Sequence, residues 1–135
     1  MADATDIPAW IALFIGLYSL AAAVGEFRMP GTWAAMVEDL AQRPGLRFLT
    51  GVFVLSLGAA IYLVTPWRPG DRLAVAVSVV GGVCVAEGLL LLAAGDRFMD
   101  FARRLMGRGS TAWAGFAALF GAAALLTALS RLQTL

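Results

Sequence analysis

The chain contains no histidine, no lysine and only one cysteine, and these absences exclude several kinds of site. Without histidine it cannot build a bis-histidine haem site or a histidine-containing metal site. Cys84 alone cannot form an intrachain disulfide or a thiolate cluster, and we expect it to pack as a small residue. No Gly-x-Ser-x-Gly motif and no phosphate-binding loop is present. We therefore expect a protein that is not an enzyme, with no catalytic residue, metal or cofactor.

Charge is also scarce. Only 14% of the 135 residues are charged and the formal net charge is +1, whereas 61% are hydrophobic. Such a small net charge provides no field that would attract nucleic acid. Soluble domains contain about 45–50% apolar residues, so this composition indicates an integral membrane protein. A spanning helix needs roughly 20 mostly apolar residues, and the chain has room for four of them.

The apolar runs predict four transmembrane helices, at residues 8–27, 47–64, 73–94 and 112–130. After the first run, Trp33, Met36, Val37 and Leu40 fall on one face of a short helix, a pattern typical of a helix that lies in the membrane interface. Residues 98–106, after the third run, form a second amphipathic segment with several arginines. The sequence thus predicts an all-α membrane protein with two surface helices.

Glycine and proline suggest where these surface helices begin and end. Pro30-Gly31 should break the first membrane helix, so we expect Thr32 to be the N-cap of the first surface helix. Gly95-Asp96 should separate the third membrane helix from the second surface helix, with Asp96 as the N-cap. The short connection at residues 68–72 predicts that the second and third membrane helices are antiparallel neighbours.

The order helix, surface helix, helix occurs twice. A shift of about 65 residues aligns Trp33 with Phe98 and Leu40 with Leu105, and a one-residue deletion then places Gly51 on Gly115. We interpret this as a duplication within a single membrane domain at 1–135, with repeat one at 8–66 and repeat two at 73–131. Each unit crosses the membrane twice, so the repeats are parallel. The alternative is that any four-helix protein with two polar loops aligns with itself.

The distribution of the ten arginines predicts the orientation in the membrane. Seven of them lie in or beside the two surface helices, and three lie on the other side. Because cytoplasmic loops are enriched in basic residues, we expect the surface helices in the cytoplasm and both termini outside. The expected location is the bacterial inner (cytoplasmic) membrane, in a multi-pass arrangement.

A short motif joins the third membrane helix to the second surface helix. The sequence AEGLLLL begins at Ala86, and FMDFARRL begins at Phe98. This motif resembles the small two-helix inner-membrane proteins of unknown function of the YjeT type, here as a tandem duplication. The second half matches better, over about residues 74–130. In the first half Ala22-Ala23 replaces the Glu-Gly pair and the acid, Glu26, comes four positions later. The resemblance implies a membrane location but no mechanism.

Glu87 is the main candidate for a functional residue. It lies about seven residues, or roughly 10 Å, inside the end of its helix. A charged group near mid-bilayer costs about 2.5–3.5 kcal/mol on insertion scales, so the carboxyl should be protonated or paired. Tyr18, Ser19 and Ser56 fall at a similar depth and are its expected neighbours. The alternatives are a proton or cation site, a contact with a polar group of a partner, and a hydrogen bond between helices.

The remaining charged residues have weaker expectations. Glu26 is two residues from Arg28 at the membrane boundary, so we expect a solvated or snorkelling carboxylate. The arginines of the second surface segment could bind lipid headgroups, and the alternative is that they only determine topology. These are Arg97, Arg103, Arg104 and Arg108.

Two functions remain open from the sequence. The first is a non-enzymatic accessory or scaffold protein that acts through helix–helix or lipid contacts, with membrane lipids and a membrane-protein partner or a homo-oligomer as its partners. The second is a small proton-coupled or cation transporter that uses Glu87.

Overall fold

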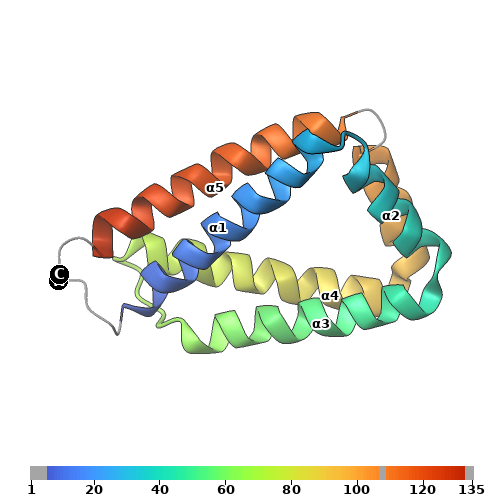
Figure 1. Ribbon diagram of the computed structural model, residues 1–135. Helices are drawn as coiled ribbons and strands as arrows, with labels where there is room; N and C mark the ends of the chain where they lie inside the picture. Colours follow the sequence, from blue (N-terminus) through green and yellow to red (C-terminus); the bar gives the residue numbers. More distant parts are fainter. Residues whose placement is uncertain (1–5, 107–108, 133–135) are drawn as a thin grey trace.

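The computed structural model describes residues 6–106 and 109–132, which form five α-helices (Figure 1). They are α1 (Ile7–Arg28), α2 (Thr32–Gln42), α3 (Pro44–Val64), α4 (Arg72–Met106) and α5 (Ser110–Leu132). All except α2 are long and apolar enough to cross a membrane. The prediction of an all-α chain with four membrane spans, and a short helix between the first two, is therefore confirmed.

The ends of α2 differ from the sequence prediction. Thr32 is the first helical residue, and Gly31, at φ +94°, occupies the N-cap position. Glycine fits there because a side chain is disfavoured at positive φ. Pro44 is the first residue of α3, where its missing N–H leaves no donor unsatisfied. One residue, Arg43, separates the two helices.

The second surface segment follows the third membrane helix after a kink within α4. It continues α4, and the only non-helical residue within that helix is Ala94, at φ −140° and ψ 49°. The predicted break is therefore confirmed one residue earlier, at Ala94, whereas Asp96 lies inside the helical segment that follows and is not its N-cap. Residues 95–106 follow the kink and lead across the end of the bundle toward α5 (Figure 1).

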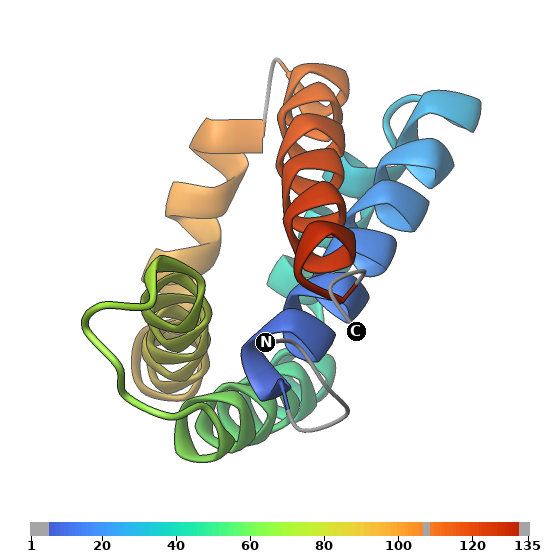
Figure 2. The same cartoon turned by 90° about the vertical axis from the view of Figure 1, so that its left-hand side faces the viewer.

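The membrane helices form two antiparallel pairs. The most extensive packing is between α3 and α4 and between α1 and α5. The first pair confirms the prediction for neighbours joined by a short connection, whereas the second joins helices from opposite ends of the chain. The pairs diverge toward one end of the molecule, where α2 and residues 95–106 span the opening (Figure 1). Viewed from the other end, the start of α1 and the end of α5 lie close together (Figure 2).

Glycines allow the close approach within each pair. A Cβ on Gly58 of α3 would lie 2.6 Å from Cβ of Cys84 and 2.7 Å from the carbonyl oxygen of Gly81 on α4. A Cβ on Gly16 of α1 would lie 2.8 Å from the carbonyl oxygen of Gly121 on α5. Small residues let helix backbones pack closely in membranes, where no hydrophobic drive brings helices together. The pairs are therefore held by backbone proximity at their crossing points.

The crossing points recur between the two halves of the chain. Gly16 and Gly81 occupy matching positions in the two pairs, as do Gly121 and Gly58. Gly51 packs against Gly88 and Leu92, but a Cβ on Gly115 would meet no atom within 4 Å. The buried residue on α5 in this region is Ala114. Gly115 is therefore not the counterpart of Gly51 in packing, whereas the duplication itself stays a prediction.

This difference between glycines provides a test with a matched control. Gly58→Ala should destabilise the protein by about 1–3 kcal/mol, because the added methyl group clashes with α4. Gly115→Ala should be neutral or slightly stabilising, since alanine favours the helix more than glycine does. Thermal unfolding in detergent measures both effects. Equal melting temperatures for the two variants would contradict the α3–α4 crossing.

Candidate functional site

Glu26 is the most completely buried polar side chain in the described residues, with 0% of its surface exposed. Its carboxylate lies where α1 ends and where both α2 and α5 begin. Oε2 accepts hydrogen bonds from the backbone N–H of Gly31 at 2.8 Å and from the hydroxyls of Ser110 at 3.0 Å and Thr111 at 3.1 Å. Oε1 accepts one from the backbone N–H of Trp33 at 2.9 Å. One carboxylate therefore connects three helices.

The expectation that Glu26 is a solvated carboxylate was wrong. The first N–H groups of a helix have no partner within the helix, and Glu26 accepts from this turn of α2. The indole Nε1 of Trp33 also donates to the carbonyl oxygen of Ala22 at 3.2 Å, so α2 is fixed to α1 at two points. A signal was present in the sequence: Glu26 lies on the helical face of two buried small residues of α1, Gly16 and Ala23, and α5 packs against Gly16.

Among the described residues, Glu87 does not form the hydrogen bond between helices that was one of its expected roles. The residue is exposed, and it has no hydrogen-bond or ion-pair partner among residues 6–106 and 109–132. Ala76 and Val80 line an apolar cavity of about 210 Å³ between α1, α4 and α5. Glu87 comes seven residues after Val80, so it lies on the same face of α4, two turns nearer the surface segment. This face is turned toward the α1–α5 pair.

The expected neighbours of Glu87 do not gather around it. Tyr18 and Ser19 of α1 line a second cavity, of about 480 Å³, together with the apolar side of α2. Ser56 of α3 lines a separate groove with Phe53 and is itself exposed. Glu87 lines neither cavity nor groove. Depth in the membrane alone does not decide these contacts, because the rotation of each helix about its axis determines which side chains meet.

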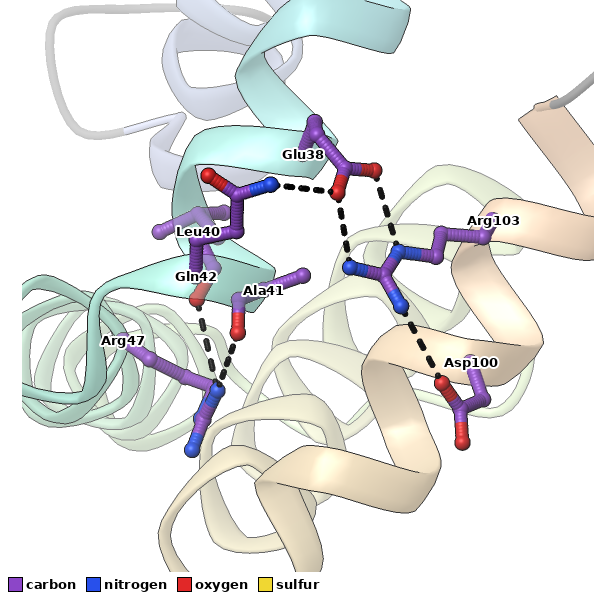
Figure 3. A network of polar contacts seen from close by, with 7 residues as sticks. All are labelled: Glu38, Leu40, Ala41, Gln42, Arg47, Asp100 and Arg103. Carbon is purple, nitrogen blue, oxygen red and sulfur yellow. Dashed lines mark hydrogen bonds and ion pairs between the residues drawn. The ribbon is translucent and has the colours of Figure 1, made fainter.

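A polar network joins the two surface segments at the open end of the bundle (Figure 3). Arg103 of α4 donates to both carboxylate oxygens of Glu38 on α2, at 2.8 and 3.1 Å. The hydrogen bond from Arg103 holds the pKa of Glu38 below its ordinary value. The guanidinium also donates to Asp100 at 3.4 Å. Glu38 and Arg103 stand 65 positions apart, so the proposed repeats contribute complementary charges at matching positions.

Arg47 supports the same region from α3 (Figure 3). Its guanidinium donates to the carbonyl oxygens of Ala41 at 3.0 Å and Leu40 at 3.4 Å, at the end of α2. The last carbonyl groups of a helix have no partner within it, and a cation there is favourable. The stem of Arg47 packs over Gly95, where a Cβ would lie 2.6 Å from Nε. The arginine thus ties α2 to the kinked part of α4.

A second cluster closes the opposite end of the bundle. Arg131 of α5 donates to both carboxylate oxygens of Asp6, at 2.9 and 3.2 Å, and to Asp71 at 2.8 Å. Asp6 also accepts from the N–H of Ala9 at the start of α1, and Asp71 accepts from Ala74 at the start of α4. Burial raises the pKa of Asp71, but the bonds from Arg131 and the backbone outweigh it and leave the pKa lowered.

The four arginines proposed as lipid ligands differ in their surroundings. Arg103 is engaged with Glu38 and Asp100, and Arg108 lies outside the described residues. Arg97 and Arg104 are exposed, and neither has a hydrogen-bond or ion-pair partner in the described part of the chain. They are seven residues apart on the segment after Ala94 and therefore share a face. Only this pair remains available to an external anion among the described candidates.

No group of three histidine, cysteine, aspartate or glutamate side chains among residues 6–106 and 109–132 could hold a metal ion. The clusters around Glu26, Glu38 and Arg131 connect helices to one another. They therefore stabilise the arrangement of the helices, whose outer surface is left for contacts with other molecules.

A scan with models of protein families, a search of curated protein sequences and a search of solved structures gave no match for this chain.

Proposed function

We propose that this protein is a non-enzymatic scaffold of the membrane, which binds lipid headgroups through its surface segment and other membrane proteins through its exposed helix faces. The observation that carries the proposal is the pair Arg97 and Arg104, which share a face and have no partner in the described residues. Arginines near the membrane surface each contribute about 1 kcal/mol to contact with anionic lipid. The other polar clusters support this by fixing the segment to the bundle.

The lipid contact is tested by neutralising the two arginines. Anionic phosphatidylglycerol nanodiscs should stabilise the parent protein relative to zwitterionic phosphatidylcholine nanodiscs with the same acyl chains. The double variant Arg97→Gln/Arg104→Gln should lose most of this difference, about 2 kcal/mol in total. The matched control is Arg68→Gln/Arg72→Gln, which removes two exposed arginines from the opposite end of the bundle. Equal losses in both double variants would contradict a specific site at Arg97 and Arg104.

The protein contacts rest on the outer helix faces. Large apolar side chains are exposed along the spans, including Phe53 at 68% and Leu119 at 74%. Lipid covers such faces in a bilayer, and it can be displaced by another helix where packing is good. Cross-linking in the native membrane, followed by purification in a mild detergent, should recover a second copy of the chain or another membrane protein. Recovery of the uncross-linked monomer alone would count against this part of the proposal.

Cation transport is the second candidate, because Glu87 lies on the α4 face turned toward the α1–α5 pair and has no partner in the described residues. An acid within a membrane span commonly marks an ion pathway. The cavity next to it on this face is lined almost entirely by apolar side chains, and a pathway would need additional polar groups there. We therefore place this function second.

We further propose that the surface segments face the cytoplasm of a bacterium and that both termini face outside, as the arginine distribution indicates. A C-terminal reporter that is active only in the cytoplasm should give no signal, whereas a reporter inserted after Arg43 should give a strong one. The reverse result would overturn the orientation. The YjeT-type resemblance of the second half belongs to the same proposal, since those proteins are also small inner-membrane proteins.

A further inference from the structure

The cavity lined by Tyr18 and Ser19 lies beneath α2, between the two diverging helix pairs. It has a volume of about 480 Å³, within the range of roughly 300–1,000 Å³ that holds small molecules in proteins. The apolar side of α2 covers it with Trp33, Met36, Val37 and Leu40. Ala22 of α1 and Ala117 of α5 also line it. The apolar side of this surface helix is therefore turned toward a cavity.

The depth of the cavity indicates what could occupy it. Along α1 its lining runs from Ala22 to Tyr18. These residues lie six and ten positions before the end of α1 at Arg28, which places them roughly 9 and 15 Å from that end. Half of the hydrocarbon core of a bilayer is also about 15 Å thick. The cavity thus extends from the level of the surface helix to the middle of the membrane, the depth of one leaflet.

The walls exclude most other occupants. Water requires two to four polar partners in a cavity, and most of the lining consists of alanine, valine, leucine, methionine and tryptophan side chains. The hydroxyl of Thr50 is already donated to the carbonyl oxygen of Leu46 at 2.8 Å. A charged metabolite would find no ionisable side chain other than Tyr18 in this lining. An apolar chain from the surrounding leaflet matches the walls in chemistry and the cavity in depth.

We propose that this cavity binds one acyl chain of a membrane lipid from the leaflet that contains α2. The bound chain fills the space between the helix pairs and packs against the apolar side of α2. It therefore acts as a structural part of the scaffold, at a place distinct from the headgroup contacts of Arg97 and Arg104. The inference extends the proposed function from the membrane surface to the interior of the bundle, but it rests on the cavity and does not require those arginines.

The test is native mass spectrometry of protein purified in a mild detergent and reloaded with phosphatidylglycerol or phosphatidylcholine of identical acyl chains. The protein is tested with Arg97→Gln/Arg104→Gln, which removes the proposed headgroup contacts, and the cavity variants are made in the same background. This protein should retain one lipid of either class. Ala22→Phe and Ala117→Phe fill the cavity from two different walls, and each should reduce the retained fraction by about tenfold, because overfilling a site costs on that order. The control is Ala60→Phe, which adds the same volume at an exposed position of α3 and should retain the lipid.

Both cavity variants should be checked for folding by thermal unfolding. Retention of the lipid by folded Ala22→Phe and Ala117→Phe proteins would overturn the proposal, and so would retention of phosphatidylglycerol alone, which would assign the binding to headgroup charge. If one variant fails to fold, the other decides. Recovery of a cross-linked protein partner should be unchanged in these variants, so loss of lipid and failure of the scaffold function are separate results.

Discussion

Replacing Glu26 with leucine should lower the melting temperature of the purified protein more than any other substitution of a glutamate in the chain. The substitution leaves four donors without their acceptor: two backbone N–H groups at the start of α2 and the hydroxyls of Ser110 and Thr111. Donors left unsatisfied in a buried place are costly, and we expect a decrease of roughly 10 °C or more. Differential scanning fluorimetry in detergent measures this decrease.

A graded pair of variants separates the hydrogen bonds from the volume of the side chain. Glu26→Gln keeps the size and one acceptor oxygen but presents an NH₂ group to at least one donor, so its melting temperature should lie between those of the parent and the leucine variant. Double replacement of Ser110 and Thr111 by alanine and valine should loosen α5 while α2 stays capped. A Glu26→Leu protein as stable as the parent would show that this carboxylate does not join the three helices.

Replacing Arg131 with leucine should give the second largest loss of stability. Its guanidinium forms ion pairs with Asp6 and Asp71, whose side chains are only 8% and 22% exposed. Without it two carboxylates remain close together and partly buried. We expect a loss on the order of 2 kcal/mol, below the value for a fully buried pair because the arginine is itself 30% exposed. Arg131→Lys should recover only part of it, since lysine cannot form the bidentate contact.

The same cluster should make stability depend on pH. The folded state lowers the pKa of Asp71, so its contribution is complete above the pKa of the unfolded chain, about 3.9. The contribution is lost as the pH falls through the lower folded pKa. Stability should therefore decrease below about pH 4 in the parent protein, and less steeply in Asp71→Asn. A parallel decrease in both would show that other carboxylates determine the acid sensitivity.

The sequence predicted the helices well because apolar run length and helical periodicity are local properties. The spans and α2 follow from those patterns, and the α3–α4 pair follows from its short connection. The α1–α5 pair could not be predicted, because helices at opposite ends of the chain carry no local sign of their contact. Their glycine crossing at Gly16 and Gly121 becomes meaningful only once the helices are placed together.

The candidate site was predicted less well for the same physical reason. Sequence position gives the depth of Glu26 and Glu87 in the membrane but not which neighbours their carboxylates meet. Glu26 looked solvated because it is close to the end of its helix, yet the chain folds back so that α2 and α5 both begin against it. Glu87 looked buried because it is deep, yet the residue is exposed and its carboxylate has no partner in the described residues. The hydrogen bonds that Glu26 accepts from Ser110 and Thr111 join residues 84 and 85 positions apart, and no local sequence pattern predicts them.

The most direct test of the scaffold proposal is complementation of a deletion strain by Glu87→Gln, with the thermal stability of the purified variant measured in parallel. Glutamine keeps a donor and an acceptor at nearly the same volume but cannot release a proton or hold a cation by charge. If the protein is a scaffold, the variant should fold as the parent does and complement fully, because Glu87 has no partner in the described residues. A well-folded Glu87→Gln protein that fails to complement would contradict the scaffold proposal and favour transport through Glu87.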